Sequence, residues 1–201
     1  MVNKPKSFAM NKTRIEAFSD GVMAIIITIM VLELKTPKSY SWEDMKPLLT
    51  MLECYVMSFA LVATYWANHH HLMHCVIRVT AKIIWANMLL LLCLSLVPFV
   101  TKWVGENGFD KVTVIAYATV CTLCAFAYTI LQQTIIGHRQ LTEKMLGALK
   151  RQSVKGMVSV SGYFISIALA FVMPLISELL FVAIPVIWII PDRNIERAVE
   201  D

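Results

Sequence analysis

Arg14-Ile-Glu-Ala-Phe18-Ser19-Asp20-Gly21-Val-Met-Ala-Ile25-Ile-Ile-Thr28-Ile-Met-Val-Leu32 contains the first long apolar run of the chain, and the expected fold follows from it. It begins with charged and hydroxyl side chains, passes an aspartate, and then has no ionisable group before Glu33. An apolar run of this length is typical of a helix that spans a membrane. A carboxylate at the edge of the hydrocarbon layer is costly unless it is paired or hydrated, so Asp20 is a candidate functional residue.

A helical wheel divides this stretch into two faces. Asp20 lies about 140° from Ile25 at 100° per residue, so we expect Asp20 and Ser19 to face neighbouring helices. The opposite stripe is also typical of an ordinary helix-packing seam, in which Thr28 bonds a carbonyl of its own helix. Periodicity alone favours that seam. The residues that share this stripe, which is about 80° wide, are Arg14, Phe18, Gly21, Ile25, Thr28 and Leu32.

The composition of the chain is that of a membrane protein. Of its 201 residues 58% are hydrophobic and 16% charged, with a mean hydropathy of +0.65. The net charge of +4 is too small to indicate a nucleic-acid partner. Further apolar runs occupy approximately residues 48–72, 81–104, 111–136, 156–173 and 175–190, the last being short and interrupted by Glu178 and Pro185. We expect an all-α protein with six transmembrane helices in a single domain, 1–201.

The distribution of basic residues predicts the orientation of these helices in the bilayer. Most of the 18 lysines and arginines lie in the N-terminal segment, the second and fourth connections and the C-terminal tail. Loops rich in lysine and arginine remain on the cytoplasmic side. We therefore expect a multi-pass protein of the cell membrane with both termini in the cytoplasm, and a basic cytoplasmic connection at 138–155.

Polar residues near the expected cytoplasmic surface form a second pattern. The second run ends in Tyr65-Trp66-Ala-Asn-His69, and Asn87 lies near the start of the third run. Polar side chains at this depth need hydrogen-bond partners on other helices. His69 is a candidate partner for Asp20 or Ser19, and the group around Asp20 is the natural partner for Asn87.

The histidines that follow raise the possibility of a metal site. His70 and His74 are four residues apart, a spacing that lets two imidazoles share one ion. His71 and Cys75 form a similar pair, but it is turned by about 100° from the first. No carboxylate is near in sequence, so His70 and His74 are only weak candidates and we expect no bound metal.

Motifs for catalysis or cofactor binding are not apparent in the sequence. It has no Walker loop, dinucleotide fingerprint, nucleophile elbow or Thr-Val-Gly-Tyr-Gly carbonyl filter. We expect no enzymatic activity and no cofactor. A membrane metalloenzyme that uses the histidine cluster remains an alternative.

Together, the motifs resemble the transmembrane protein 175 family, the lysosomal-type potassium channels. The resemblance covers approximately residues 12–101 and rests on Arg14-x-x-x-Phe18-Ser19-Asp20, on Tyr65-Trp66-x-x-His69, and on Asn87 followed by an apolar run to Pro98-Phe99. It implies a cation channel without a carbonyl filter. Because the chain has one six-helix repeat, it resembles the prokaryotic form, which assembles as a homotetramer in the lipid bilayer.

The resemblance also implies roles for individual residues. The first helices would line the pore, with a hydrophobic constriction at Ile25, a ring of hydroxyls at Thr28 and a second apolar ring at Leu32. K+, and other monovalent cations, would pass through it without a cofactor. A structural network would hold the first helix in place; its members would be Arg14, Phe18, Ser19, Asp20, Trp66, His69 and Asn87.

A different class of function remains open. Asp20 and His69 are ionisable residues near the edge of the membrane, as in transporters that carry protons. A secondary transporter or proton-coupled carrier that uses Asp20 and His69 is therefore the main alternative to a channel.

Overall fold

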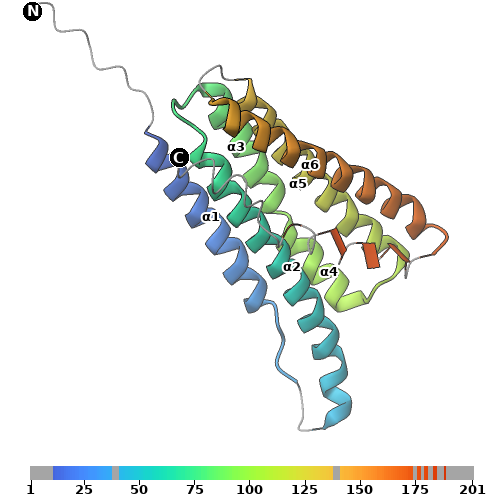
Figure 1. The fold of residues 1–201 in the computed structure, drawn as a ribbon. Helices are drawn as coiled ribbons and strands as arrows, with labels where there is room; N and C mark the ends of the chain where they lie inside the picture. The colour runs from blue at the N-terminus through green and yellow to red at the C-terminus, as the bar shows by residue number, and fades with distance from the viewer. Residues whose placement is uncertain are drawn as a thin grey trace, which may run out of the picture.

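The computed structural model describes residues 11–37, 41–137, 141–173, 176–177, 179–180, 183–184 and 188. Figure 1 shows them as a bundle of long helices, with α1 at one edge beside α2, and α5 and α6 on the far side. The elements in chain order are α1 (Lys12–Leu32), α2 (Trp42–His74), α3 (Ala81–Leu94), α4 (Val97–Asn107), α5 (Lys111–Ile136) and α6 (Glu143–Ala170). The all-α prediction is confirmed.

The described residues contain five stretches long and apolar enough to cross a membrane: Lys12–Leu32, Leu48–His74, Ala81–Asn107, Lys111–Ile136 and Glu143–Ala170. These correspond to the first five predicted spans. The expected sixth span, 175–190, falls largely outside the described residues, as do Glu178 and Pro185. The terminal segments 1–10 and 189–201, whose basic residues contributed to the predicted orientation, also lie outside them.

The third span is made of two helices. α3 ends at Leu94 and α4 begins at Val97, with Pro98 in its first turn. Proline has no amide hydrogen and is tolerated at the start of a helix, where that hydrogen would lack a helical partner. At the break, the Ser95 hydroxyl donates to the carbonyl of Leu92 over 2.7 Å. The break therefore begins three residues before Pro98.

The basic connection predicted at 138–155 is wrong from residue 143 onward. There α6 already begins, with the side chain of Thr142 accepting a hydrogen bond from the amide of Met145 as its N-cap. The first turns of α6 bury Ala148, Leu149 and Gln152, which recur at helical spacing. The lysines and arginines between these positions lie on the other face of the helix. Because they are numerous, this amphipathic helix has the composition of a loop.

α1 packs against α2, α3 and α4 through one face only. Its buried side chains recur every three or four residues, as expected for a helix with a single packed face. These side chains are Ile15, Ser19, Met23, Ile26 and Met30. Among the described residues, Ile25, Thr28 and Leu32 of α1 are exposed on the side away from this packed face, and the position of α1 at the edge of the bundle is what exposes the candidate site.

Candidate functional site

The stripe that the helical wheel predicted on α1 is exposed along its whole length. The exposed fraction is 58% for Ile25 and 81% for Leu32, so both side chains lie on the surface of the chain. Gly21 and Thr28 are exposed between and beside them. The face that carries this stripe therefore lies opposite the packed face of α1, and it is available to bilayer, water or another chain. Its members are Arg14, Phe18, Gly21, Ile25, Thr28 and Leu32.

Thr28 occupies the middle of the exposed stripe. Its hydroxyl donates to the carbonyl of Ile25 over 3.0 Å, one turn earlier in α1. This bond uses the only hydroxyl hydrogen, so the lone pairs of Thr28 Oγ1 are left to accept or to coordinate. The hydroxyl oxygen thus lies between two apolar side chains on a face that the chain itself does not cover.

A buried chain of hydrogen bonds joins α1, α2 and α3. Asn87 lies at its centre: its Oδ1 is 2.7 Å from His69 Nε2, and its Nδ2 donates to Ser19 Oγ over 2.9 Å. The Ser19 hydroxyl donates in turn to the carbonyl of Ile15 over 2.8 Å. Ser19 has one hydrogen and gives it to Ile15, so it must accept from Asn87, and His69 Nε2 must donate to the amide oxygen.

Asp20 is bonded by Trp66, which is not a member of the buried chain of hydrogen bonds. Trp66 Nε1 donates to its carboxylate over 2.9 Å, and both side chains are exposed at the edge of the contact between α1 and α2. We expected His69 to bond Asp20 or Ser19 directly. Instead, Asn87 lies between His69 and Ser19, and Trp66 takes the place beside Asp20. The remaining two members of the predicted network, Arg14 and Phe18, lie on the exposed stripe with Ile25.

The histidine pair lies at the end of α2, next to the start of α1. His70 Nε2 and His74 Nε2 are 3.2 Å apart, and both rings are exposed. Lys12 of α1 donates to the carbonyl of His74 over 3.3 Å and lies 3.8 Å from Glu16. Within the part of the chain that the structure describes, no three histidine, cysteine, aspartate or glutamate side chains converge in a manner that would hold a metal ion.

A second polar cluster was missed in the sequence. Gln132 Nε2 donates to Gln152 Oε1 over 2.8 Å, and Gln152 Nε2 donates to Asn68 Oδ1 over 3.1 Å, which links α5, α6 and α2. All three amides are buried. Gln132, near the end of α5, is covered by the first half of α6. The available signal was its position in an apolar run, where an amide needs a partner.

Two ion pairs join the C-terminal end of α1 to α4. Lys102 Nζ lies 2.6 Å from Glu33 Oε2, and Lys35 pairs with Glu106. Glu33 follows directly after Leu32, so these pairs tie down the end of the exposed stripe. The buried network at Ser19 and the ion pairs at Glu33 therefore hold the two ends of α1 by different means.

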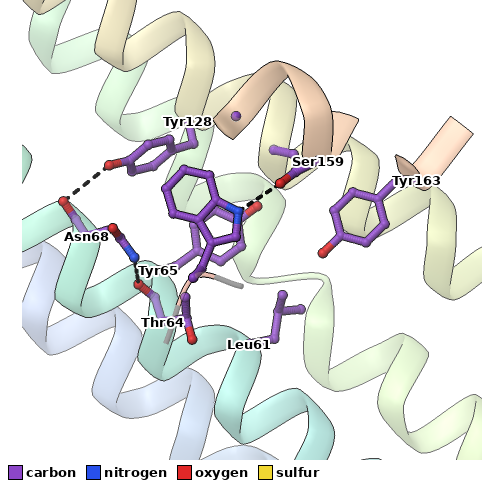
Figure 2. Close-up of a pocket in the computed structure, with 10 residues that line it drawn as sticks. Leu61, Thr64, Tyr65, Asn68, Tyr128, Ser159 and Tyr163 are labelled. Carbon is purple, nitrogen blue, oxygen red and sulfur yellow. Dashed lines mark hydrogen bonds between the residues drawn. The ribbon is translucent and has the colours of Figure 1, made fainter. Parts of the chain in front are cut away.

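A small cavity of about 30 Å³ lies between α2, α5 and α6. Figure 2 shows the hydrogen bond from Tyr128 to the backbone carbonyl of Asn68 at its edge, which measures 3.2 Å. The exposed wall surface of the cavity is mainly apolar. It is separated from the exposed stripe by the thickness of α2. The lining residues are Leu61, Thr64, Tyr65, Asn68, Ala125, Tyr128, Gly156, Ser159, Tyr163 and Trp188.

Comparison with known proteins places this arrangement in a family. Residues 14–98 match the family model described as the endosomal/lysosomal potassium channel TMEM175. A potassium channel of Chryseobacterium sp. (strain P1-3) is 42% identical over 192 residues, which cover 96% of this chain and 100% of the relative. A potassium channel of Streptomyces collinus is 30% identical over 169 residues, which cover 79% of this chain and 82% of the relative.

The fold comparison agrees with the sequence comparison. The crystal structure of a lysosomal potassium-selective channel TMEM175 homologue from Chamaesiphon minutus superposes with a TM-score of 0.76. It is 25% identical and covers 90% of this chain and 97% of its own. The region matched by the family model, residues 14–98, contains most of α1, all of α2 and α3 and the residues of the buried network, and it ends at the start of α4. With a full-length relative at 42% identity and this shared fold, the chain belongs to the TMEM175 family, in its prokaryotic single-repeat form.

Proposed function

We propose that this protein is a potassium-permeable channel that conducts K+ passively through a homotetrameric pore lined by α1. The single observation that carries the proposal is the exposed stripe of α1. On this face Ile25, Thr28 and Leu32 present two large apolar side chains with an accessible hydroxyl between them, which is the set of groups that a pore lining without a carbonyl filter needs. A pore shared by four copies gives that face a function, and the relatives named as potassium channels support it.

The order of side chains along the stripe supports a hydrophobic constriction. Ile25 and Leu32 are seven residues apart, so they project in similar directions two turns apart, with Thr28 between them. Rings of such side chains narrow a pore and disfavour water, and this controls conduction without a carbonyl filter. Thr28 oxygens between the rings would replace part of the hydration of the permeating ion. Without dense charge on the stripe, we expect modest preference for K+ over Na+.

The remaining predicted residues have positioning roles in this proposal. Ser19, His69 and Asn87 hold α1 against α2 and α3, while Trp66 orients Asp20 on the outside of that contact. Asp20 therefore anchors α1 and does not contact the ion. The positive-inside distribution of charge supports a cell-membrane protein whose termini and histidine pair face the cytoplasm.

Single-channel recording tests the proposal most directly. The purified protein in planar bilayers should give unitary current steps, and Ile25→Asn should raise conductance and weaken K+ over Na+ discrimination because a polar side chain wets the constriction. Ile165→Asn on α6 is the matched control, since Ile165 is exposed to a similar extent, 55%. Unitary steps that Ile25→Asn leaves unchanged would contradict the assignment of the constriction.

The alternative, a secondary transporter or proton-coupled carrier, predicts a different result in single-channel recording. Flux would be limited by turnover, without unitary steps, and would be lost in Asp20→Asn or His69→Gln. In the channel proposal these two variants alter stability or assembly, and the permeation properties of correctly assembled channels remain.

A further inference from the structure

The exposed histidine pair at the end of α2 has the geometry of a metal chelate. Two nitrogens that bind one tetrahedral zinc ion, each at about 2.0–2.1 Å, lie about 3.3 Å from each other. The Nε2 atoms of His70 and His74 are 3.2 Å apart. The separation of the two nitrogens therefore matches the one that a shared ion requires, and the ion would take the place of the hydrogen between them.

The surroundings hold His70 in this orientation. Its ring stacks on the indole of Trp66, with the centroids 6.2 Å apart and an interplanar angle of 24°. Trp66 is itself fixed by its hydrogen bond to Asp20. The His70 and His74 rings meet at 73°, with centroids 4.5 Å apart, so the contact between the two rings also limits their rotation. A chelate whose ligands are preoriented loses less conformational entropy on binding.

The charges near the pair do not oppose a cation strongly. Lys12 is the nearest lysine, and its ammonium group is directed to the carbonyl of His74 and toward Glu16, 3.8 Å away. Glu16 therefore offsets part of the charge of Lys12 beside the pair. Both imidazoles are exposed, so water can complete the coordination of an ion. With two protein ligands, this is an open and exchangeable site rather than a closed structural one.

We propose that His70 and His74 form a binding site for a divalent transition metal ion, such as Zn2+ or Ni2+, at the α2 end that lies beside the start of α1. Imidazole nitrogen favours these ions over Mg2+ and Ca2+, which take oxygen ligands. The proposed metal site does not depend on ion conduction. Its test can therefore fail or succeed without affecting the proposed channel function.

Isothermal titration calorimetry with Zn2+ tests the site on full-length protein in detergent from which any polyhistidine tag has been removed. We expect one ion per chain, no binding of Mg2+, and affinity that falls at least about tenfold in both His70→Ala and His74→Ala. His71→Ala is the matched control, because it removes a histidine from the same turn and leaves the pair intact; we expect its affinity to be unchanged.

X-ray absorption at the zinc edge gives an independent measurement. Two imidazole ligands per ion are expected in the unaltered protein, and one in His74→Gln, a polar variant that keeps this exposed position hydrated. The proposal is overturned if the unaltered protein binds no Zn2+, if the His70 and His74 variants keep its affinity, or if His71→Ala weakens binding as much as they do.

Discussion

The amide of Asn87 on α3 donates to the hydroxyl of Ser19 on α1 over 2.9 Å, and both side chains are completely buried. The same amide accepts from His69 of α2, so one side chain satisfies polar groups on two other helices. Asn87 thereby fixes both the depth and the rotation of α1 at its inner end. The rotation of α1 decides which side chains it exposes, so the network and the exposed stripe are two consequences of one packing arrangement.

Replacement of Asn87 by alanine should destabilise the protein. It removes two hydrogen bonds and leaves His69 and Ser19 buried without these partners, for which we expect a loss of about 1–2 kcal/mol. Denaturant titration of the purified protein in mixed detergent micelles measures the free energy of unfolding. Asn107→Ala is the control, because Asn107 is exposed and bonds only its own helix, at the carbonyl of Trp103. Equal stability losses in the two variants would show that the buried network has no special contribution.

Replacement of Thr28 by valine should reduce the discrimination between K+ and Na+. Valine has nearly the shape of threonine but lacks the hydroxyl oxygen that is accessible on the stripe. Thr119→Val on α5 is a close control, since Thr119 is also exposed and donates to a carbonyl of its own helix, that of Ile115, over 2.8 Å. Reversal potentials under bi-ionic conditions give the permeability ratio. A shift in the ratio that appears equally in both variants would argue against a role for Thr28 in permeation.

The glutamine pair between α5 and α6 should show energetic coupling. In Gln132→Ala or Gln152→Ala alone, one buried amide loses its partner, while in the double variant both are gone. A double-mutant cycle on the free energy of unfolding should therefore give a coupling of about 0.5–3 kcal/mol. The comparison pair is Gln133 and Ser153, whose bond of 2.7 Å lies closer to the surface. Additive effects at Gln132 and Gln152 would refute the coupling.

The ion pair of Glu33 with Lys102 should matter through its charge and not its shape. Glu33→Lys places two cations together at the end of α1 and should lower the thermal unfolding temperature. Lys102→Glu in the same chain should restore it, because the exchanged pair has the same attraction. The difference between single and double variants should shrink as salt is raised, since exposed charges are screened. If the double variant is no more stable than the single variant Glu33→Lys, attraction between the two charges does not stabilise the protein.

Sequence patterns were sufficient to locate most of the helices and to divide α1 into two faces. The apolar runs predicted the five membrane-length stretches of the described residues, and the start and end of α5 agree with the run at 111–136. The polar residues Ser19, Trp66, His69 and Asn87 were recognised as a group because amides and imidazoles are costly in an apolar layer. Their individual bonds were not predictable, since Asn87 and Trp66 reach their partners from separate helices.

The first half of α6 shows where local patterns fail. Its lysines and arginines gave residues 143–155 the appearance of a cytoplasmic loop, yet Leu149 and Gln152 are buried against α5. Whether such an amphipathic segment folds depends on a surface that can cover its narrow packed face. Gln132 supplies part of that surface from elsewhere in the chain.

The sequence by itself determined that the chain spans a membrane with helices and that Ile25, Thr28 and Leu32 share a face of α1, because hydropathy and helical periodicity are local properties of the chain. Only the tertiary structure decided that this face is the exposed one, that Trp66 and not His69 bonds Asp20, and that His70 and His74 converge beside α1. The physical reason is that each of these depends on the rotation and depth of one helix against another, which are set by packing across residues far apart in the sequence.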